Sequence, residues 1–347
     1  MRERILTMGG PGVGKSKALL DIAKAFANNK EWAVVAKKAK LPDVQVMVYA
    51  IDPDDGLPPL VEHEGPEHYP NFEHILAAGE RPLVDIYEAV FGAWSILGGS
   101  ARQAMRDELA AKGRVPTAED IFSLGVIDAG LAYWVQAQAI AVARAYDLEV
   151  KAVRLPHWIC CEMLGRWWDF AQEEYAQATN KAEHIGQLLL QRKLAKIENP
   201  REGTVGGFEG RSEWPIIKRM HKDIVDYLLL RSPVNLYATT SVSDLPTRPD
   251  GSPLNAGASD ILAAFSLRPE GEKHNLYLFD RMLLLRRTGK LRSMVIVKDR
   301  PEFKVDTDKA DWSGKSFWEV YAGLDKRPKD YLPGWDVTKR ALKEGGK

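Results

Sequence analysis

The chain has 347 residues, of which 45% are hydrophobic and 28% charged, and this is the composition of a globular protein with a sizeable core. The formal net charge is zero, which excludes a global electrostatic field that would draw the chain to nucleic acid or to a membrane surface. The charge is uneven, however: residues 43–88 carry eleven Asp or Glu against one Arg, and residues 281–304 carry eight Lys or Arg against two acids. A neutral total therefore hides an acidic and a basic region.

Cysteine usage and hydropathy indicate a cytoplasmic protein. Cys160 and Cys161 are adjacent in an apolar run, so we expect reduced, buried thiols. No signal peptide is visible, because the first apolar strand begins almost at Met1. The longest apolar stretch, 131–145, is interrupted by two glutamines and an arginine, so we expect no membrane-spanning helix.

The first third of the chain predicts alternating strands and helices. Residues 5–8 form an apolar strand that leads into a glycine-rich turn, and apolar residues recur at helical spacing from residue 16 onward. A second buried strand covers 44–51. The following segment, 57–82, is rich in Pro, Glu and His and is expected to be a loop, and a helix is expected over 83–97.

The remaining elements continue the alternation. Residues 98–150 are expected to form a helical insertion, residues 158–161 a third core strand, and 164–197 one long helix. The expected elements after that are a loop 199–212, a helix 214–228, a strand 234–241, a loop 243–258, two strands 276–285 and 291–297, and a polar tail.

Strands that alternate with helices favour an α/β fold with a mostly parallel central sheet and helices on both faces. We expect one core domain over 1–305, which contains the helical insertion at about 98–150, and a C-terminal tail over 306–347.

One motif is specific on its own. Residues 9–16 read Gly9-Gly10-Pro11-Gly12-Val13-Gly14-Lys15-Ser16, which matches the P-loop pattern G-x-x-x-x-G-K-[ST]. In such a loop the glycines let backbone N–H groups surround the phosphates, Lys15 reaches the β/γ oxygens, and the Ser16 hydroxyl binds Mg²⁺. The motif predicts binding of ATP, or a closely related nucleoside triphosphate, together with Mg²⁺.

Hydrolysis also requires carboxylates near the attacking water and near Mg²⁺. Three apolar runs end in an acid, at Asp52, Asp128 and Glu162. Asp128 is the weakest of these candidates, because it also suits the cap of the helix that follows.

With these residues in view, the chain resembles RecA-like P-loop ATPases. The resemblance implies that Asp54, just beyond the second strand, polarises the attacking water, although the family residue is usually Glu. It also implies that Glu162 is the Walker B acid near Mg²⁺, where the family usually has Asp. Thr239, Thr240 and the residue after them end the fourth strand, where the family has a polar sensor.

The late strand 295–300 strengthens the resemblance. It ends in Lys298 and Arg300, similar to a pair that in RecA-like rings and filaments reaches the nucleotide of the neighbouring subunit. The pair implies self-association and a catalytic role for both residues. The dipeptide Glu213-Trp214 before a long helix further resembles phage RecA-like ATPases of the single-strand annealing recombination type.

The resemblance implies that single-stranded DNA is a partner, held by the two loops 199–213 and 243–272. Arg201, Arg211 and Arg248 are the candidate DNA-binding residues, because phosphates require cations. Acidic residues balance the arginines of the first loop, so ordinary solvated loops explain the composition equally well.

The leading interpretation is an ATPase that acts on single-stranded DNA in recombination or replication. Three alternatives stay open: a P-loop kinase for a small molecule or nucleotide, a packaging-type motor, and a nucleotide-gated scaffold with weak hydrolysis. The unusual acids Asp54 and Glu162 keep the last alternative open. A cluster of His and Glu between 62 and 74 lacks the fixed spacing of a zinc site.

Overall fold

The computed structural model describes residues 3–27, 44–78, 81–83, 85–86, 153–182, 185–198, 208, 212–231, 235–245, 266–272, 277–299 and 309–324. The helix expected over 83–97 lies almost wholly outside these ranges, and the helical insertion expected at about 98–150 lies entirely outside them.

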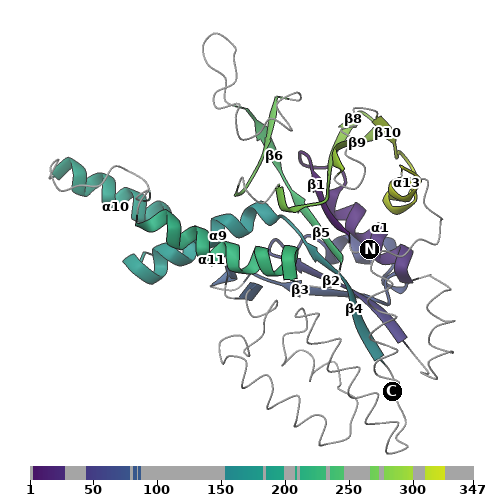
Figure 1. Cartoon of the computed structure of the whole chain (residues 1–347), viewed down its shortest axis with the longest axis horizontal. Coiled ribbons are helices and arrows are strands. Elements are labelled where there is room, and N and C mark those ends of the chain that lie inside the picture. Colours follow the sequence, from purple (N-terminus) through teal and green to yellow (C-terminus); the bar gives the residue numbers. More distant parts are fainter. Residues whose placement is uncertain are drawn as a thin grey trace, which may run out of the picture.

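A central sheet organises the described part of the chain (Figure 1). Its strands are, in chain order, β1 (Arg4–Met8), β2 (Val44–Asp52), β3 (Phe72–Leu76), β4 (Val153–Cys161), β5 (Asn235–Thr240), β8 (Arg281–Thr288), β9 (Leu291–Asp299) and β10 (Lys309–Asp311). Across the sheet the order is β10-β9-β8-β1-β5-β4-β2-β3. The six strands from β8 to β3 are parallel to one another. Strand β9 is antiparallel to β8, and β10 is antiparallel to β9. Two short strands, β6 (Val242–Asp244) and β7 (Leu267–Pro269), pair with each other.

Helices cover both faces of this sheet. The helices α1 (Lys15–Ala27) and α13 (Phe317–Leu324) pack on one face, and α9 (Leu164–Asn180) and α11 (Glu213–Asp226) pack on the other. A π-helical turn, η2 (Tyr227–Arg231), continues α11. Parallel strands buried on both faces explain the continuous apolar runs of the sequence, since every residue of β5 is buried. The predicted α/β fold class is therefore confirmed. No helix within the described ranges is long and apolar enough to cross a membrane.

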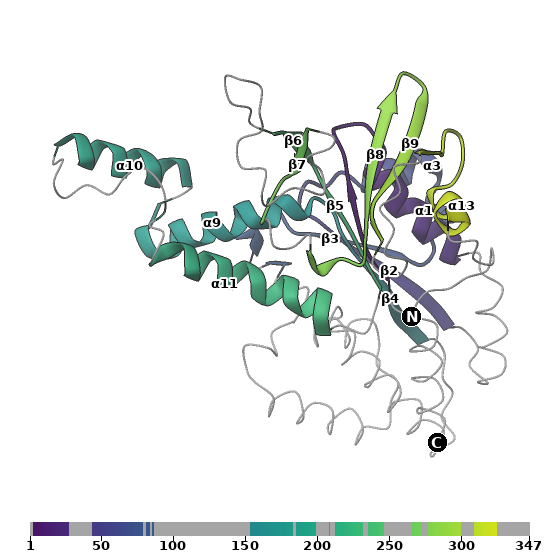
Figure 2. The ribbon, with the colours of Figure 1, turned by 45° about the horizontal axis from the view of Figure 1, so that its top comes forward.

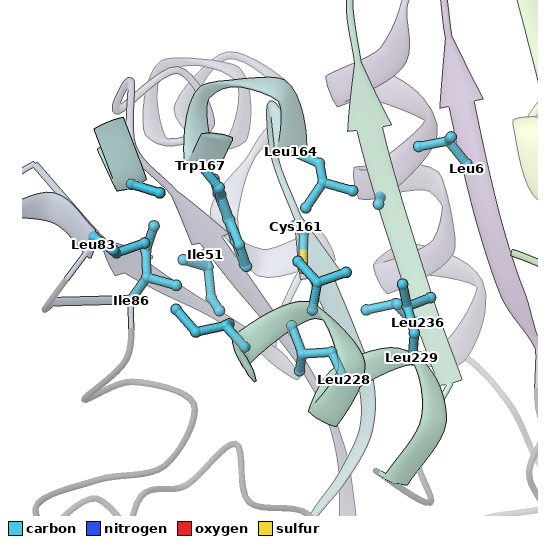
Figure 3. Close-up of a cluster of buried hydrophobic side chains, with 14 of the residues drawn as sticks. Leu6, Ile51, Leu83, Ile86, Cys161, Leu164, Trp167, Leu228, Leu229 and Leu236 are labelled. Atoms are coloured by element: carbon cyan, nitrogen blue, oxygen red, sulfur yellow. The ribbon is translucent and has the colours of Figure 1, made fainter. Parts of the chain in front are cut away.

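The core under α9 and α11 draws on distant segments (Figure 3). Trp167 descends from α9, and Leu228 and Leu229 descend from the π-helical turn, toward the sheet residues Ile51 and Cys161. All five side chains are almost fully buried. Burying one such large apolar side chain stabilises the fold by about 1.5–3 kcal/mol, so this cluster fixes the end of β4 from which the candidate site projects.

Two expectations about individual elements are wrong. The long helix expected over 164–197 is broken, because Lys181 takes the left-handed conformation (φ 53°) and its N–H closes the end of α9. A separate helix, α10 (Ile185–Glu198), then leads away from the sheet (Figures 1 and 2). The segment 57–82, expected as a loop, contains α3 (Pro58–Glu64), the 3₁₀ turn η1 (Pro66–His68) and β3. Two of the prolines that suggested a loop, Pro58 and Pro59, stand at the start of α3, where proline is tolerated.

Part of the segment assigned to a C-terminal tail, 306–347, is built into the core. Strand β10 pairs with β9, and α13 brings Phe317 and Trp318 against α1. The Trp318 ring lies edge-on to Phe26, with centroids 5.4 Å apart. The buried Asp21 carboxylate of α1 accepts the backbone N–H of Phe317 at 2.7 Å. This bond satisfies an otherwise unpaired N–H at the start of α13.

Candidate nucleotide site

The glycine-rich loop lies between β1 and α1, at the edge where the parallel strands end. Gly12 and Gly14 have φ values of 68° and 105°, which glycine alone adopts at little cost. Gly9 has no space for a side chain, since a Cβ there would stand 2.6 Å from the carbonyl oxygen of Leu285. Conformation and close packing both require glycine here, and the loop presents the N-terminus of α1 to any anion.

The Lys15 side chain folds back over this loop. Its ammonium donates hydrogen bonds to the carbonyl oxygens of Gly9 and Gly10, at 2.8 and 2.9 Å. Burial lowers the pKa of Lys15, and the negative charge of Glu162 partly offsets that effect. Bonds from a cation to neutral carbonyls are weaker than bonds to an anionic phosphate, so Lys15 is poised to exchange its present partners for phosphate oxygens.

Ser16 and Glu162 meet beside the loop. The Ser16 hydroxyl donates to Oε1 of Glu162 at 2.7 Å. The other carboxylate oxygen, Oε2, is buried and has no hydrogen-bond partner among the described residues. Burial raises the pKa of Glu162 to about 7, although interactions with the Ser16 and Thr239 hydroxyls act in the opposite direction. A buried carboxylate oxygen without a hydrogen-bond partner is costly, so this oxygen is suited to accept a cation or a water.

Mg²⁺ fits this arrangement. The ion prefers oxygen ligands, and it usually keeps several waters while it binds one or two protein groups and the substrate phosphates. The Ser16 hydroxyl and the Glu162 carboxylate supply two such oxygens next to the phosphate-binding loop. Within the described ranges no three His, Cys, Asp or Glu side chains gather to hold a metal unaided. The donors therefore suit a cation that arrives with a nucleotide.

Two hydroxyl groups lie at the end of β5, the strand between β1, which leads into the glycine loop, and β4, which leads into Glu162. Thr239 accepts the N–H of Met163 at 2.7 Å, and Thr240 donates to the carbonyl oxygen of Glu270 at 3.0 Å. Glu270 also acts on the loop, since its charge tends to raise the pKa of Lys15. The two threonines predicted as a polar sensor thus stand at the predicted edge of the sheet.

The candidate acids at the end of β2, Asp52 and Asp54, have different environments. Asp52 is fully buried and accepts the N–H groups of Asp54 and Leu57 at 3.1 and 3.0 Å. Burial alone would raise the pKa of Asp52, but the hydrogen bonds from His74 and from the backbone outweigh burial and lower it. Asp54 is exposed, and its carboxylate lies 3.9 Å from Arg166. Asp52 therefore holds the turn together, whereas Asp54, like its neighbour Asp55, faces solvent.

Lys298 lies two strands away from β1, level with Leu6 and therefore before the glycine loop begins. Strand β9 runs antiparallel to β8, so its last residues lie at the edge where β1 begins. The Lys298 ammonium donates to the carbonyl oxygens of Tyr277 and Phe279, at 3.2 and 2.8 Å. Arg300 lies outside the described residues.

The remaining candidates give little structural information. Asp128, Arg201, Arg211 and Arg248 all lie outside the described residues. Phe208, in the first expected DNA-binding loop, is buried, and its ring packs edge-on against Tyr175 and Trp214. Phe208 therefore contributes to the core and is not available to stack on a base.

Sequence reasoning missed a pair of arginines beside the loop. Arg287 and Arg292 are direct cross-strand partners in the β8–β9 hairpin. Arg287 donates to the carbonyl oxygen of Gly12 at 3.4 Å, and a Cβ placed on Gly14 would stand 3.7 Å from Nη1 of Arg292. The available signal was a basic run around a glycine turn, which is also typical of a solvated hairpin tip.

Two comparisons with known proteins found no match, and a search of solved structures found similar chains. No protein-family model matches the chain, and a search of curated proteins finds no match. Among solved structures, the chain is similar to the crystal structure of the RadB recombinase, with a TM-score of 0.37 and 10% sequence identity. The similarity covers 90% of this chain and 87% of that chain. Similarity of this degree identifies no family.

Proposed function

We propose that the protein binds ATP with Mg²⁺ at the glycine loop and hydrolyses it, as a RecA-like ATPase. The observation that carries the proposal is the meeting of Lys15, Ser16 and Glu162 around one loop. Lys15 supplies charge for the β/γ oxygens, and the other two supply oxygens for Mg²⁺. The bound ion would neutralise charge that develops on the transferred phosphoryl group.

Nucleotide binding is tested by titrating Mg-ATP into the wild-type protein and Lys15→Ala in a calorimeter. Loss of the ammonium should weaken binding about 100-fold, because a charge-assisted contact to phosphate is removed. Thermal unfolding of the free protein should change little. Lys24→Ala, at the other end of α1, is the matched control and should bind normally. Equal affinities for wild type and Lys15→Ala would contradict the site.

We propose that Asp54 polarises the attacking water. Its carboxylate faces solvent at the edge of the sheet that carries the glycine loop, whereas both oxygens of Asp52 accept bonds from its own turn. Asp54→Asn should bind ATP normally but lose turnover by about 100-fold or more, since a neutral amide is a poor base. Asp52→Asn should instead destabilise the turn. Normal turnover in Asp54→Asn would remove the assignment.

We further propose, from the sequence resemblance, that the ATPase acts on single-stranded DNA in recombination or replication, like the phage single-strand annealing type. Arg201, Arg211 and Arg248 would contact phosphates. DNA affinity should then fall steeply with salt, and Arg201→Ala with Arg211→Ala should flatten that dependence. Phosphate release that DNA does not stimulate would favour the kinase or scaffold alternatives instead.

A further inference from the structure

The β8–β9 hairpin ends in a tight turn next to the glycine loop. Thr288 pairs with Leu291, which leaves Gly289 and Lys290 as the turn, and Gly289 has a φ of 61° that suits glycine. One step before the turn, Arg287 pairs directly with Arg292. Directly paired residues project from the same face of a sheet, so Arg287 and Arg292 project from the same face of the hairpin.

This pairing is unfavourable for the free protein, because like charges directly opposite one another destabilise an antiparallel pair. Within the described ranges neither arginine forms an ion pair with an acid. Arg287 donates to the carbonyl oxygens of Gly289 and Gly12, at 3.0 and 3.4 Å. The guanidinium of Arg292 lies over the Trp312 ring, 5.5 Å from its centroid. No acid among the described residues therefore pairs with either arginine.

Packing holds the pair against the glycine loop. A Cβ on Gly14 would stand 2.9 Å from the buried Trp312 ring, so ring and loop are in close contact. The same ring lies under the guanidinium of Arg292, and the backbone N–H of Arg292 donates to the Ser313 hydroxyl at 2.7 Å. Hairpin, ring and loop thus form one packed unit, and Arg287 reaches the loop at Gly12.

We propose that Arg287 and Arg292 clamp the phosphate chain of the nucleotide bound to the glycine loop of the same chain. The inference rests on the proposed nucleotide site and adds two binding residues to it. It also names a substrate class, because the pair binds the polyphosphate whatever the base is. Guanidinium groups are well suited to this role, because their planar donors match phosphate oxygens in pairs. A bound polyphosphate would also relieve the repulsion between the two arginines.

The test measures the affinity of Mg-ATP and of inorganic triphosphate for the wild-type protein, Arg287→Gln with Arg292→Gln, and Lys290→Gln. The double variant should bind both ligands about tenfold more weakly, or worse, because two charged contacts are removed. Lys290→Gln removes a charge from the same turn outside the pair, and should bind within about twofold of the wild type. The midpoint temperature of thermal unfolding should rise slightly in the free Arg287→Gln variant. If Arg287 only stabilised the fold, this temperature would fall instead.

Each outcome decides a different point. If the wild type binds ATP and the double variant binds it equally well, the clamp is wrong and the nucleotide site stands. If ATP binding weakens but triphosphate binding does not, the pair contacts the nucleoside and the substrate class is wrong. If the wild type binds neither ligand, the proposed function fails and the clamp fails with it.

Discussion

The polar groups at the two ends of β1 differ in how completely they are hydrogen-bonded or paired with opposite charges. At its beginning, Arg281 donates to the Tyr321 hydroxyl at 2.6 Å, and that hydroxyl donates to the Glu3 carboxylate at 2.9 Å. All three side chains are buried, and the arginine also lies 3.6 Å from the Glu3 carboxylate. At the other end, the buried Glu162 keeps one oxygen without a partner among the described residues, and Arg287 opposes another arginine.

This difference in pairing distinguishes groups that stabilise the fold from groups that are suited to bind a ligand. Buried polar groups are normally fully hydrogen-bonded, and the closed network at the start of β1 follows that rule. The open end of β1 departs from it with an acid, a lysine and an arginine pair around one loop. Groups whose partners are incomplete and whose pKa values are displaced gather where ligands bind. Substitutions at the first end should therefore change folding, and those at the second end should change binding.

The largest effect on folding is expected for Arg281→Met. Removing one partner of a buried ion pair leaves the Glu3 carboxylate uncompensated, which destabilises by about 3–5 kcal/mol. Urea unfolding should show this loss, while the surviving folded protein should bind Mg-ATP normally. A parallel loss of ATP affinity would show that the two ends of β1 are coupled, since distant and independent sites behave additively.

Acid sensitivity should come from a group at neither end. His221 is buried edge-on to Trp168, and burial lowers the pKa of His221 to about 4 from an ordinary 6.5. The folded state therefore resists protonation. The neutral His221 therefore contributes fully to the free energy of unfolding above about pH 6.5. This contribution, up to about 3 kcal/mol, is lost as the pH falls toward 4.

His221→Leu should flatten that profile, which urea unfolding across this pH range would measure. His63→Gln, at an exposed position, is the control and should keep the wild-type slope. If His221→Leu keeps it as well, another buried group carries the acid sensitivity.

A matched pair of substitutions tests the comparison most directly. Glu3→Gln and Glu162→Gln each replace a buried carboxyl group by an amide, and the two glutamates lie near opposite ends of β1. Glu3→Gln should destabilise by about 1–3 kcal/mol, because it weakens a satisfied network. Glu162→Gln should leave the free protein equally or more stable at neutral pH, since a costly buried charge disappears. Turnover should fall only in Glu162→Gln. Destabilisation by both substitutions to the same extent would remove the distinction.

Much of the fold was predictable from periodicity. Parallel strands buried on both faces read as apolar runs, so the strands around 5–8, 158–161 and 234–241 and the α/β class follow from the sequence. The break at Lys181 was not predictable, because the apolar period continues across it and a single left-handed residue ends the helix. The position of α13 depends on contacts with α1, which is far away in the chain.

The site was predictable only where one local pattern carries it. Residues 9–16 combine the loop conformation, Lys15 and Ser16 in a single motif. The partner Glu162 followed from its place after an apolar strand. The pair Arg287 and Arg292 was missed, because its significance comes from long-range packing against Gly12 and Gly14 and from no local pattern.

A small effect on folding is expected for Lys298→Ala, and this variant could show that the closed end of β1 also has a function. The ammonium of this half-buried residue caps the carbonyl oxygens of Tyr277 and Phe279, so its loss should cost about 1 kcal/mol or less. If ATP sites form between subunits of a ring or filament, as the sequence resemblance implies, Lys298 and Arg300 instead complete a neighbour's site. Turnover should then fall far more than stability does.

Mixing variants distinguishes these two roles. Arg300→Ala supplies an intact glycine loop, and Lys15→Ala supplies an intact Lys298 and Arg300. Each variant alone should be almost inactive, because a cation that reaches the γ-phosphate contributes about 1,000-fold or more to turnover. Mixed together they should partly recover phosphate release, since some interfaces would combine both intact halves. A protein that remains monomeric with ATP and DNA, yet hydrolyses ATP at its full rate, would show that this end of β1 serves folding alone.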